Sequence, residues 1–117
     1  VESNGRTTMY LIRRVWRVKP REARRVATAA AIVGKAYEAA GQRSPTTVYF
    51  NGGTLPGERD VVVMEWTEDV IQSPYRAGNE FPGGLSELGA LLREAATETW
   101  IEFYELMTED KAIDLES

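Results

Sequence analysis

Four polar residues at alternating positions of three expected strands can lie on one face of a sheet. They are the residues best suited to catalysis. Successive strand residues point to opposite faces, so Tyr49 and Asn51 share a face that Arg13 and Glu65 can join. A carboxylate beside a phenol and an amide in an apolar cleft has a shifted pKa and can transfer a proton. The pattern predicts Glu65 and Tyr49 as acid or base and Asn51 as an oxyanion partner. The alternative is a cross-strand pair between Arg13 and Glu65 at a dimer surface.

A second group of candidates lies in segment 68–84, a long expected loop that contains prolines and glycines and has no sustained period. We predict that Arg76 binds a ligand carboxylate with two hydrogen bonds and that Tyr75 or Phe81 stacks on the ligand ring. Asn79 adds an amide to the same predicted binding set. The alternative is a surface loop that Tyr75 and Phe81 anchor to the body of the protein.

Two further aromatic residues, Tyr37 and Trp66, complete the predicted substrate-binding set together with Arg13. Tyr37 lies on the apolar stripe of an expected helix, where a buried phenol requires a hydrogen-bond partner. Trp66 lies near the end of an expected strand. Large aromatic residues at such positions are also typical of a hydrophobic core, which is the alternative for both.

The sequence contains no histidine and no cysteine, which excludes several common kinds of active site. Ser-His-Asp triads, thiol nucleophiles and the usual zinc site all need those residues. The acidic residues are scattered along strands and a tail, whereas an oxygen-only metal site needs several convergent carboxylates. No Gly-x-Gly-x-x-Gly or Walker pattern is present. We therefore expect no metal and no cofactor, and any acid–base work falls to Asp, Glu, Tyr, Lys and Arg.

Charge is divided unevenly along the 117 residues, whose net charge is −4. Residues 1–43 carry ten Lys or Arg and three Asp or Glu, whereas residues 44–117 carry four and fifteen. One interpretation is a basic face for phosphates or nucleic acid. The other is that the two halves interleave in one fold and pair their charges across neighbouring strands. Because the whole chain is acidic, we expect no nucleic-acid partner.

The chain has the length of a single domain, and its composition is that of an ordinary globular protein. No apolar run approaches the ~20 residues of a membrane span, and no continuous apolar stretch precedes Met9. We therefore expect no membrane partner and a cytoplasmic location.

Apolar periodicity predicts a strand, a helix, two strands, a helix and a last strand in one domain that spans residues 8–107. The predicted elements are a strand at 8–19, a helix from Pro20 to Gly41, strands at 45–51 and 60–67, a helix from Ser86 to about Thr97 and a strand at 99–107. We expect a flexible lead at 1–7 and an acidic tail at 108–117. The competing interpretation of 86–107 is one long helix.

Two βαβ units with right-handed crossovers give an α+β, ferredoxin-like sandwich. The four strands form one antiparallel sheet, and both helices lie on one face of it. The opposite face carries apolar and aromatic side chains that water contact would destabilise. We therefore expect a homodimer in which a second copy covers this face.

With this element order, the chain resembles the dimeric α/β-barrel superfamily over residues 8–107. The resemblance rests on the first strand running into Val18-Lys19-Pro20-Arg21, on the long helix that ends at Gly41, and on the strand pair that ends in Glu65-Trp66-Thr67. The strand, Val-Lys-Pro and helix junction is similar to the NIPSNAP-like and antibiotic-biosynthesis-monooxygenase-like branches. The haem-binding branches use a histidine ligand, which this chain lacks.

The resemblance implies a small organic ligand, often aromatic, held in a cleft between sheet and helices. It implies a small-molecule enzyme or binding protein, with cofactor-independent oxygenation or proton transfer on an aromatic, polyketide-like compound as the sharpest hypothesis. The alternative is a non-catalytic dimeric interaction module. The sequence does not decide whether the chain is an enzyme. An RNA-recognition domain is disfavoured, because the third strand lacks the Lys/Arg-Gly-Phe/Tyr pattern of those domains.

Overall fold

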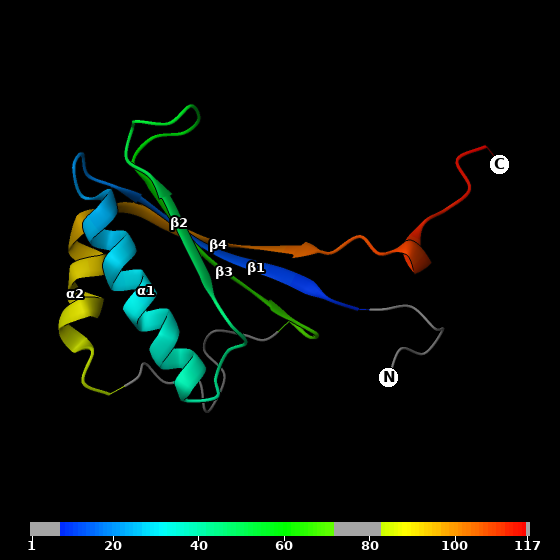
Figure 1. Ribbon diagram of the computed structural model, residues 1–117, viewed down its shortest axis with the longest axis horizontal. Coiled ribbons are helices and arrows are strands. Elements are labelled where there is room, and N and C mark those ends of the chain that lie inside the picture. Colours follow the sequence, from blue (N-terminus) through cyan, green and yellow to red (C-terminus); the bar gives the residue numbers. More distant parts are fainter. Residues whose placement is uncertain (1–7, 72–82, 117) are drawn as a thin grey trace.

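A computed structural model describes residues 8–71 and 83–116 of the chain, which form a sheet and a layer of two helices (Figure 1). The elements in chain order are β1 (Tyr10–Val18), α1 (Ala23–Ala39), β2 (Thr47–Asn51), β3 (Val61–Glu68), α2 (Ser86–Ala95), β4 (Ala96–Glu105) and the 3-10 helix η1 (Glu109–Lys111). The element order and the α+β class agree with the prediction, and the arrangement is consistent with a ferredoxin-like fold. The lead at 1–7 lies outside the described residues.

Both ends of α1 depend on backbone turns. Pro20 lies in a turn instead of the first helical turn, and Arg21 adopts a left-handed backbone with φ 72°. At the other end, Gly41 takes φ 74°, its N–H bonds the carbonyl of Glu38, and the Gln42 N–H bonds the carbonyl of Tyr37. This pair of bonds is the Schellman arrangement, and it confirms that the helix ends at this glycine.

The last strand begins earlier than predicted, at Ala96, directly after α2 ends at Ala95. Ala96 has an extended backbone (φ −86°, ψ 138°), and it pairs with Val18 where the register between β1 and β4 shifts. The Lys19 N–H donates to the Ala95 carbonyl at 3.0 Å, which joins the end of β1 to this junction. The alternative of one helix over 86–107 is therefore wrong.

All strand pairs are antiparallel, and the sheet order is β2-β3-β1-β4. β1 is an inner strand, between β3 and β4. Its Arg13 lies opposite Glu65 of β3 and Glu102 of β4. The basic first strand thus pairs with two strands from the acidic half, and this register confirms the interleaving of charge for this part of the chain.

The hydrophobic core lies between the sheet and the two helices. Val26 and Ala30 of α1 and Val62 and Met64 of β3 are at its centre, all with 2% exposure or less. The stripe of α1 that faces the sheet is rich in alanine, so the helix approaches the strands closely. None of the helices in the described ranges has the length and hydropathy needed to cross a bilayer.

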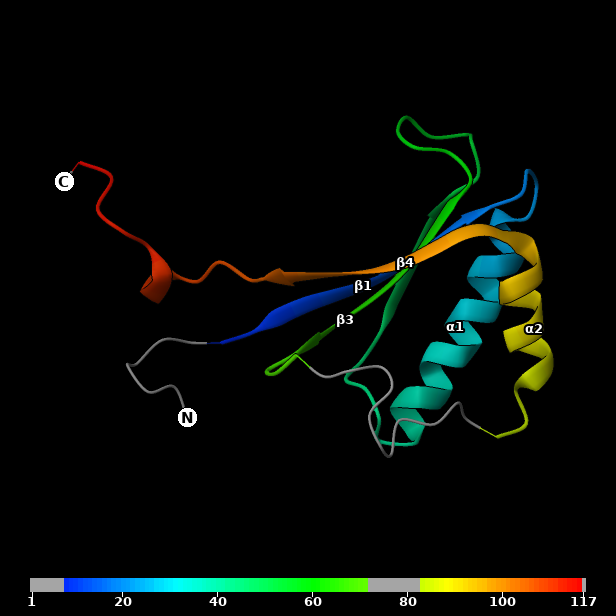
Figure 2. The same cartoon turned by 180° about the vertical axis from the view of Figure 1, so that it is seen from behind.

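The helices cover only one end of the sheet. In both views β1 and β4 continue past the helices, and residues 106–116 extend further in the same direction (Figures 1 and 2). The molecule measures 50 × 37 × 19 Å, and its radius of gyration is 16.7 Å. A compact chain of this length has a radius near ~13 Å. The helices of the described residues therefore leave a large part of the sheet without cover.

Candidate functional site

The sheet face opposite the helices, called the open face below, is organised in rows of side chains that run across the strands. Residues directly opposite one another share a face, so the antiparallel register defines each row. The three rows at the centre of the face are Asn51–Val61–Arg17–Glu98, Tyr49–Val63–Val15–Trp100 and Thr47–Glu65–Arg13–Glu102. A mostly apolar row thus lies between two rows that carry ion pairs.

Three of the predicted site residues meet on the open face, each from a different strand. The Tyr49 hydroxyl of β2 donates a hydrogen bond to Glu65 Oε1 of β3 at 2.8 Å. Arg13 Nε of β1 donates to the same hydroxyl at 3.1 Å, and it lies 3.9 Å from Glu65 Oε1. These three groups thus meet as their strand positions predicted, and their catalytic role stays a prediction. We call them the Arg13–Tyr49–Glu65 cluster.

The cluster continues onto β4 through Glu102, which the sequence analysis did not identify. Arg13 Nη1 donates to Glu102 Oε1 at 2.7 Å. The Trp100 indole N–H donates to Glu102 Oε2 at 2.7 Å, and the Tyr104 hydroxyl donates to Oε1 at 3.0 Å. Alternating polar and aromatic residues at 98, 100, 102 and 104 were the available indication that this strand contributes to the face. Arg13 is therefore shared between two carboxylates.

The surroundings of Tyr49 and Glu102 shift the pKa values of both groups. Partial burial raises the pKa of Tyr49 because it disfavours the phenolate, and the bond to Glu65 raises it further while Arg13 opposes. The indole of Trp100 lowers the pKa of Glu102 most, with Tyr104 and Arg13 adding to the effect against the opposing effect of burial. At neutral pH Tyr49 is therefore a protonated phenol and Glu102 an ionised carboxylate.

A second ion-pair group borders the apolar row on its other side. Arg17 Nε donates to Glu98 Oε1 at 2.9 Å, Arg17 Nη1 bonds Glu58, and the guanidinium lies 5.7 Å from the Trp100 ring centroid. Between the two groups, Val15 is 3% exposed and Val63 is 2% exposed. The open face thus carries more charged side chains than predicted, and no helix of the described residues lies over its two buried valines.

Asn51 shares the parity of the cluster, but its amide bonds the hairpin loop. Its Oδ1 accepts from the Gly53 N–H at 2.8 Å, and its Nδ2 donates to the Leu55 carbonyl at 3.1 Å. Asn51 stands opposite Val61, in the row beyond Tyr49. The structure therefore does not bring this amide to the cluster, and its role toward an oxyanion stays a prediction.

Tyr37 and Trp66 lie on the other side of the sheet, within the core against the helices. The guanidinium of Arg43 lies between them, 3.8 Å from the Tyr37 ring centroid and 4.1 Å from that of Trp66. This double cation–π contact fixes the segment after α1 against β3. Arg43 was not among the predicted site residues, because it follows Gly41 in an irregular segment. The predicted binding residues Arg13 and Trp66 thus lie on opposite sides of one sheet.

Four other candidates, Tyr75, Arg76, Asn79 and Phe81, lie outside the described residues. Their role in ligand binding stays a prediction. Within the described ranges, no group of three or more acidic residues is placed to hold a metal ion.

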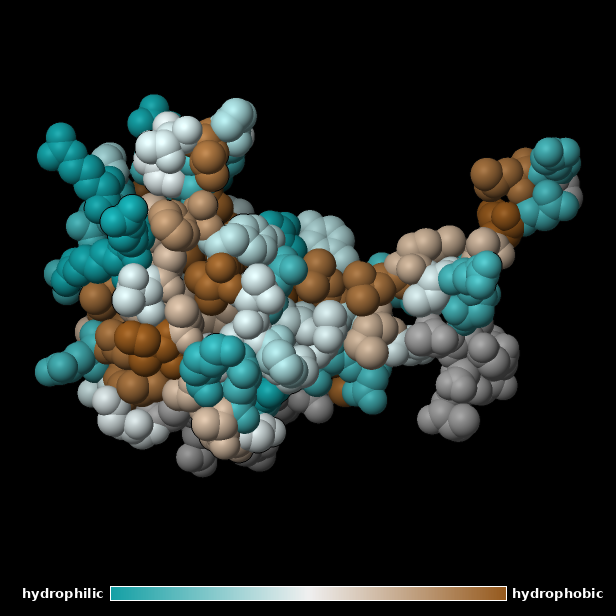
Figure 3. All heavy atoms as spheres, in the orientation of Figure 1, coloured by the Kyte–Doolittle hydropathy of each residue, from teal (hydrophilic) through white to brown (hydrophobic). Residues whose placement is uncertain are grey.

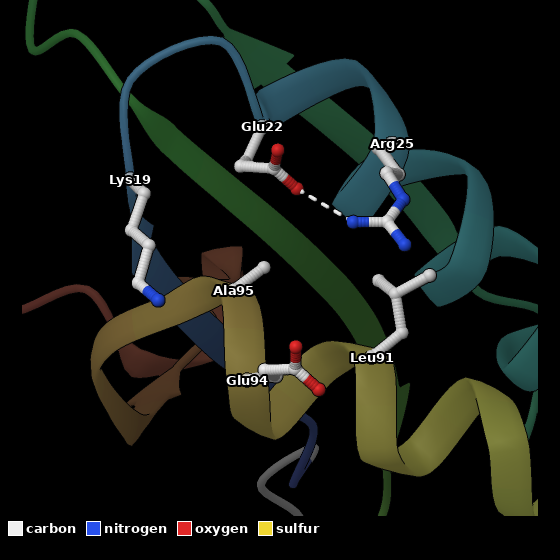
Figure 4. Close-up of a pocket in the computed structure, with 6 residues that line it drawn as sticks. All are labelled: Lys19, Glu22, Arg25, Leu91, Glu94 and Ala95. Atoms are coloured by element: carbon white, nitrogen blue, oxygen red, sulfur yellow. Dashed lines mark hydrogen bonds and ion pairs between the residues drawn. The ribbon is translucent and has the colours of Figure 1, made fainter.

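Two of the shallow hollows lined by described residues lie away from the cluster. One, of about 150 Å³, opens between the start of α1 and the end of α2 (Figure 4). The other, of about 250 Å³, lies beside β4, with Trp16 and Leu92 among its lining residues. Neither hollow is lined by a residue of the Arg13–Tyr49–Glu65 cluster.

Comparison with known proteins adds evidence about the fold. No protein-family model matches the chain, and no curated protein matches it either. A similar solved structure is that of a conserved protein of unknown function from Bacteroides thetaiotaomicron, described as a possible oxidoreductase. It is 18% identical with a TM-score of 0.59, and the match covers 86% of this chain and 100% of that one. A likeness at this identity shows a shared fold.

Proposed function

We propose that the chain is one subunit of a homodimeric small-molecule enzyme whose site lies on the open face at the Arg13–Tyr49–Glu65 cluster. The observation that supports this most directly is the hydrogen-bonded Tyr49–Glu65 pair beside the apolar row of Val15 and Val63. A phenol and a carboxylate that share a hydrogen bond next to buried valines suit proton transfer to and from a ligand. The site therefore differs from the expected cleft, because it lies on the sheet face away from the helices.

A second copy is the partner that completes this site. Tyr49 and Tyr104 are 41% and 48% exposed on the open face, and no helix of the described chain covers them. Two open faces related by a two-fold axis would cover each other and remove the cluster from bulk water. Exclusion of water strengthens the hydrogen bonds and charge interactions of such a site.

The proposed reaction begins with removal of a proton from an acidic C–H group of a hydroxylated aromatic ligand. Glu65 takes the proton, Tyr49 turns its hydroxyl to the oxyanion that forms, and Arg13 balances its charge. With dioxygen as oxidant, the resulting carbanion is oxidised, so that a ring CH₂ and O₂ give a ring C=O and water. The similar Bacteroides protein is described as a possible oxidoreductase, and an oxidation is compatible with that description.

The hydrogen bonds among the polar side chains of the open face favour a second function. Arg13 bonds both Tyr49 and Glu102, and Glu102 also accepts hydrogen bonds from Trp100 and Tyr104. A network of this kind suits a polar layer within a non-catalytic dimer interface. The first function predicts catalysis at the open face, whereas the second predicts none.

The test uses anthrone, a planar aromatic ketone with an acidic CH₂, as probe. Its oxidation by the wild-type protein is followed by oxygen uptake and by absorbance of the quinone product. Glu65→Gln is expected to lower turnover about a hundredfold or more, because a general base is lost. Glu98→Gln, in the other charged row of the same face, is the matched control and should stay within about twofold.

Unchanged turnover in Glu65→Gln would remove the proposed base. If neither anthrone nor hydroxylated aromatic compounds change the NMR chemical shifts of the open-face residues, the interaction module would be favoured. Binding without turnover would indicate a ligand-binding protein at the same face.

A further inference from the structure

The last described residues form an arm that carries the most exposed large apolar side chains of the described chain. This C-terminal arm, residues 106–116, contains Met107, Ile113 and Leu115, which are 72%, 77% and 87% exposed. It extends from the end of β4 away from the body, and its outer part includes apolar surface (Figures 1 and 3). Apolar side chains presented in this way mark a contact with another molecule.

The arm follows a path that its own contacts define. Lys111 donates to the Leu106 carbonyl at 2.7 Å and pairs with Glu105 at 2.9 Å, and its side chain is only 8% exposed. The 3-10 turn η1 includes this lysine, and Ile113 and Leu115 follow it. Four carboxylates and one lysine give residues 106–116 a net charge of −3. The arm is therefore an acidic segment with apolar side chains beyond a fixed bend.

A surface of opposite charge lies at the turn between β1 and α1. We call Lys19, Arg21, Arg24 and Arg25 the basic corner; they stand with Glu22 in one short segment. Arg25 pairs with Glu22 at 3.0 Å, but the other three bases enter none of the ion pairs found in ranges 8–71 and 83–116.

The basic corner borders the smaller of the two hollows, of about 150 Å³. Figure 4 shows Leu91 and Ala95 of α2 facing Glu22 and Arg25 across this hollow, with Glu94 on its rim. The corner thus combines cations with a small apolar surface. That combination matches the acidic and apolar composition of the arm.

The arm and the basic corner lie at opposite ends of the sheet. In the antiparallel pairing of β1 with β4, Tyr10 stands opposite Glu105 at one end and Val18 opposite Ala96 at the other. The ten residues of β4 span about 33 Å. A two-fold axis that is perpendicular to the strands and passes between two open faces exchanges these ends. The arm of one copy then lies at the same end of the dimer as the basic corner of the other.

We infer that the C-terminal arm of each copy docks at the basic corner of a second copy. Ile113 and Leu115 cover the apolar surface of Leu91, and the carboxylates of the arm meet Arg21 and Arg24. This inference rests on the face-to-face dimer of the proposed function, and it adds a second contact outside the open faces. The contact forms twice in each dimer, because the two-fold axis relates both arms to both corners.

Cross-linking tests the geometry, and the natural chain has no cysteine to interfere. A chain with Leu115→Cys is mixed with a chain with Arg24→Cys under mild oxidation, and linked peptides are identified by mass spectrometry. We expect a mixed disulfide between the two chains. The matched control replaces Arg24→Cys by Glu87→Cys, in the first turn of α2, and should give little product.

Sedimentation equilibrium of the full chain tests the energetics. The double variant Ile113→Ser/Leu115→Ser is expected to raise the dimer dissociation constant at least about a hundredfold, because two apolar contacts are lost on each arm. Charge reversal by Glu109→Lys/Glu116→Lys should weaken the dimer, and added Arg21→Glu/Arg24→Glu should restore part of the loss.

The outcomes separate this inference from the proposed function. A dimer that the serine variant leaves unchanged and that gives no 115–24 disulfide would overturn the docking of the arm alone. Equal cross-linking to positions 24 and 87 would overturn the basic corner as its site. A wild-type chain that stays monomeric at every concentration would overturn both proposals.

Discussion

The two faces of the sheet bury their central residues by different means. On the covered face, Met64 and Val62 are enclosed by side chains from the helices. On the open face, Val15 and Val63 reach a similar degree of burial, and their neighbours on that face, Arg13 and Tyr49, belong to the sheet itself. Low exposure therefore does not by itself identify the core of this protein.

The difference indicates which face can carry chemistry. The covered face is apolar and closely packed, so a ligand there would have to displace core side chains. The open face presents hydrogen-bonded polar groups on an apolar floor, and their surroundings are open to a partner or a ligand. The following substitutions test this contrast, from the largest expected effect to the smallest.

Met64→Ala is expected to lower the free energy of unfolding by about 3–4 kcal/mol, because it leaves a cavity within the enclosed core. Val63→Ala changes the adjacent residue of the same strand, on the open face. We expect a loss of only about 1–2 kcal/mol there, since the long side chains above can settle into the space. Urea denaturation of both variants measures the difference. Equal losses would mean that the open face is as rigidly packed as the core.

Gly34→Ala tests how closely the segment before β2 approaches α1. A Cβ at position 34 would lie 2.5 Å from Thr46 Oγ1 and 3.5 Å from Met64 Sδ. Thr46 cannot move freely, because its hydroxyl and its N–H both donate to Glu38 Oε2, at 2.8 and 2.7 Å. We expect a net loss of about 1–2 kcal/mol, although alanine is the better helix former by about 1 kcal/mol.

Thr46→Ala provides the control for the glycine substitution. If the clash causes the loss, adding Gly34→Ala to Thr46→Ala should cost clearly less than adding it to the wild type. A stabilised Gly34→Ala single variant would show that this segment adjusts easily and that the close approach is not required.

The sequence predicted the architecture and one part of the candidate site. The element order follows from apolar periodicity, and the meeting of Arg13, Tyr49 and Glu65 follows from strand parity and antiparallel pairing. The alternation of side chains along a strand predicts the face on which each one lies, but it does not predict its hydrogen-bond partners. Asn51 is followed by two glycines, and an asparagine in that position favours a bond to its own turn.

Other parts of the site depend on distances that no local pattern specifies. The register of β4 against β1 is not constrained by a hairpin turn, and it includes an irregularity between Arg17 and Val18. For that reason Glu102 could not be assigned to Arg13 from the sequence. Arg43 was missed for a similar cause, since its position between two rings depends on the path of the chain after Gly41.

Arg13→Met tests the shared cation of the open face. The substitution keeps most of the apolar stem but leaves Glu65 and Glu102 on either side without the positive charge between them. We expect a loss of about 1 kcal/mol in the free energy of unfolding, because the ion pairs are about a quarter exposed and screened by water. Adding Glu102→Gln should recover part of this loss, whereas additive losses would show that the two groups act independently.

The smallest predicted effect is a change in acid sensitivity. The folded-state pKa of Glu102 is lowered mainly by the Trp100 indole N–H, so its ionised form stabilises the fold above the unfolded pKa, near ~4.3. This contribution is lost as pH falls through the lowered folded-state value. Glu102→Gln should therefore flatten the decline of stability below about pH 4.5. Glu38→Gln is the counterpart in the helix layer, since the Thr46 N–H lowers the pKa of Glu38. Urea denaturation from pH 6 to pH 3 compares them, and a Glu102→Gln profile parallel to the wild type would show that the open-face network adds no pH-dependent stability.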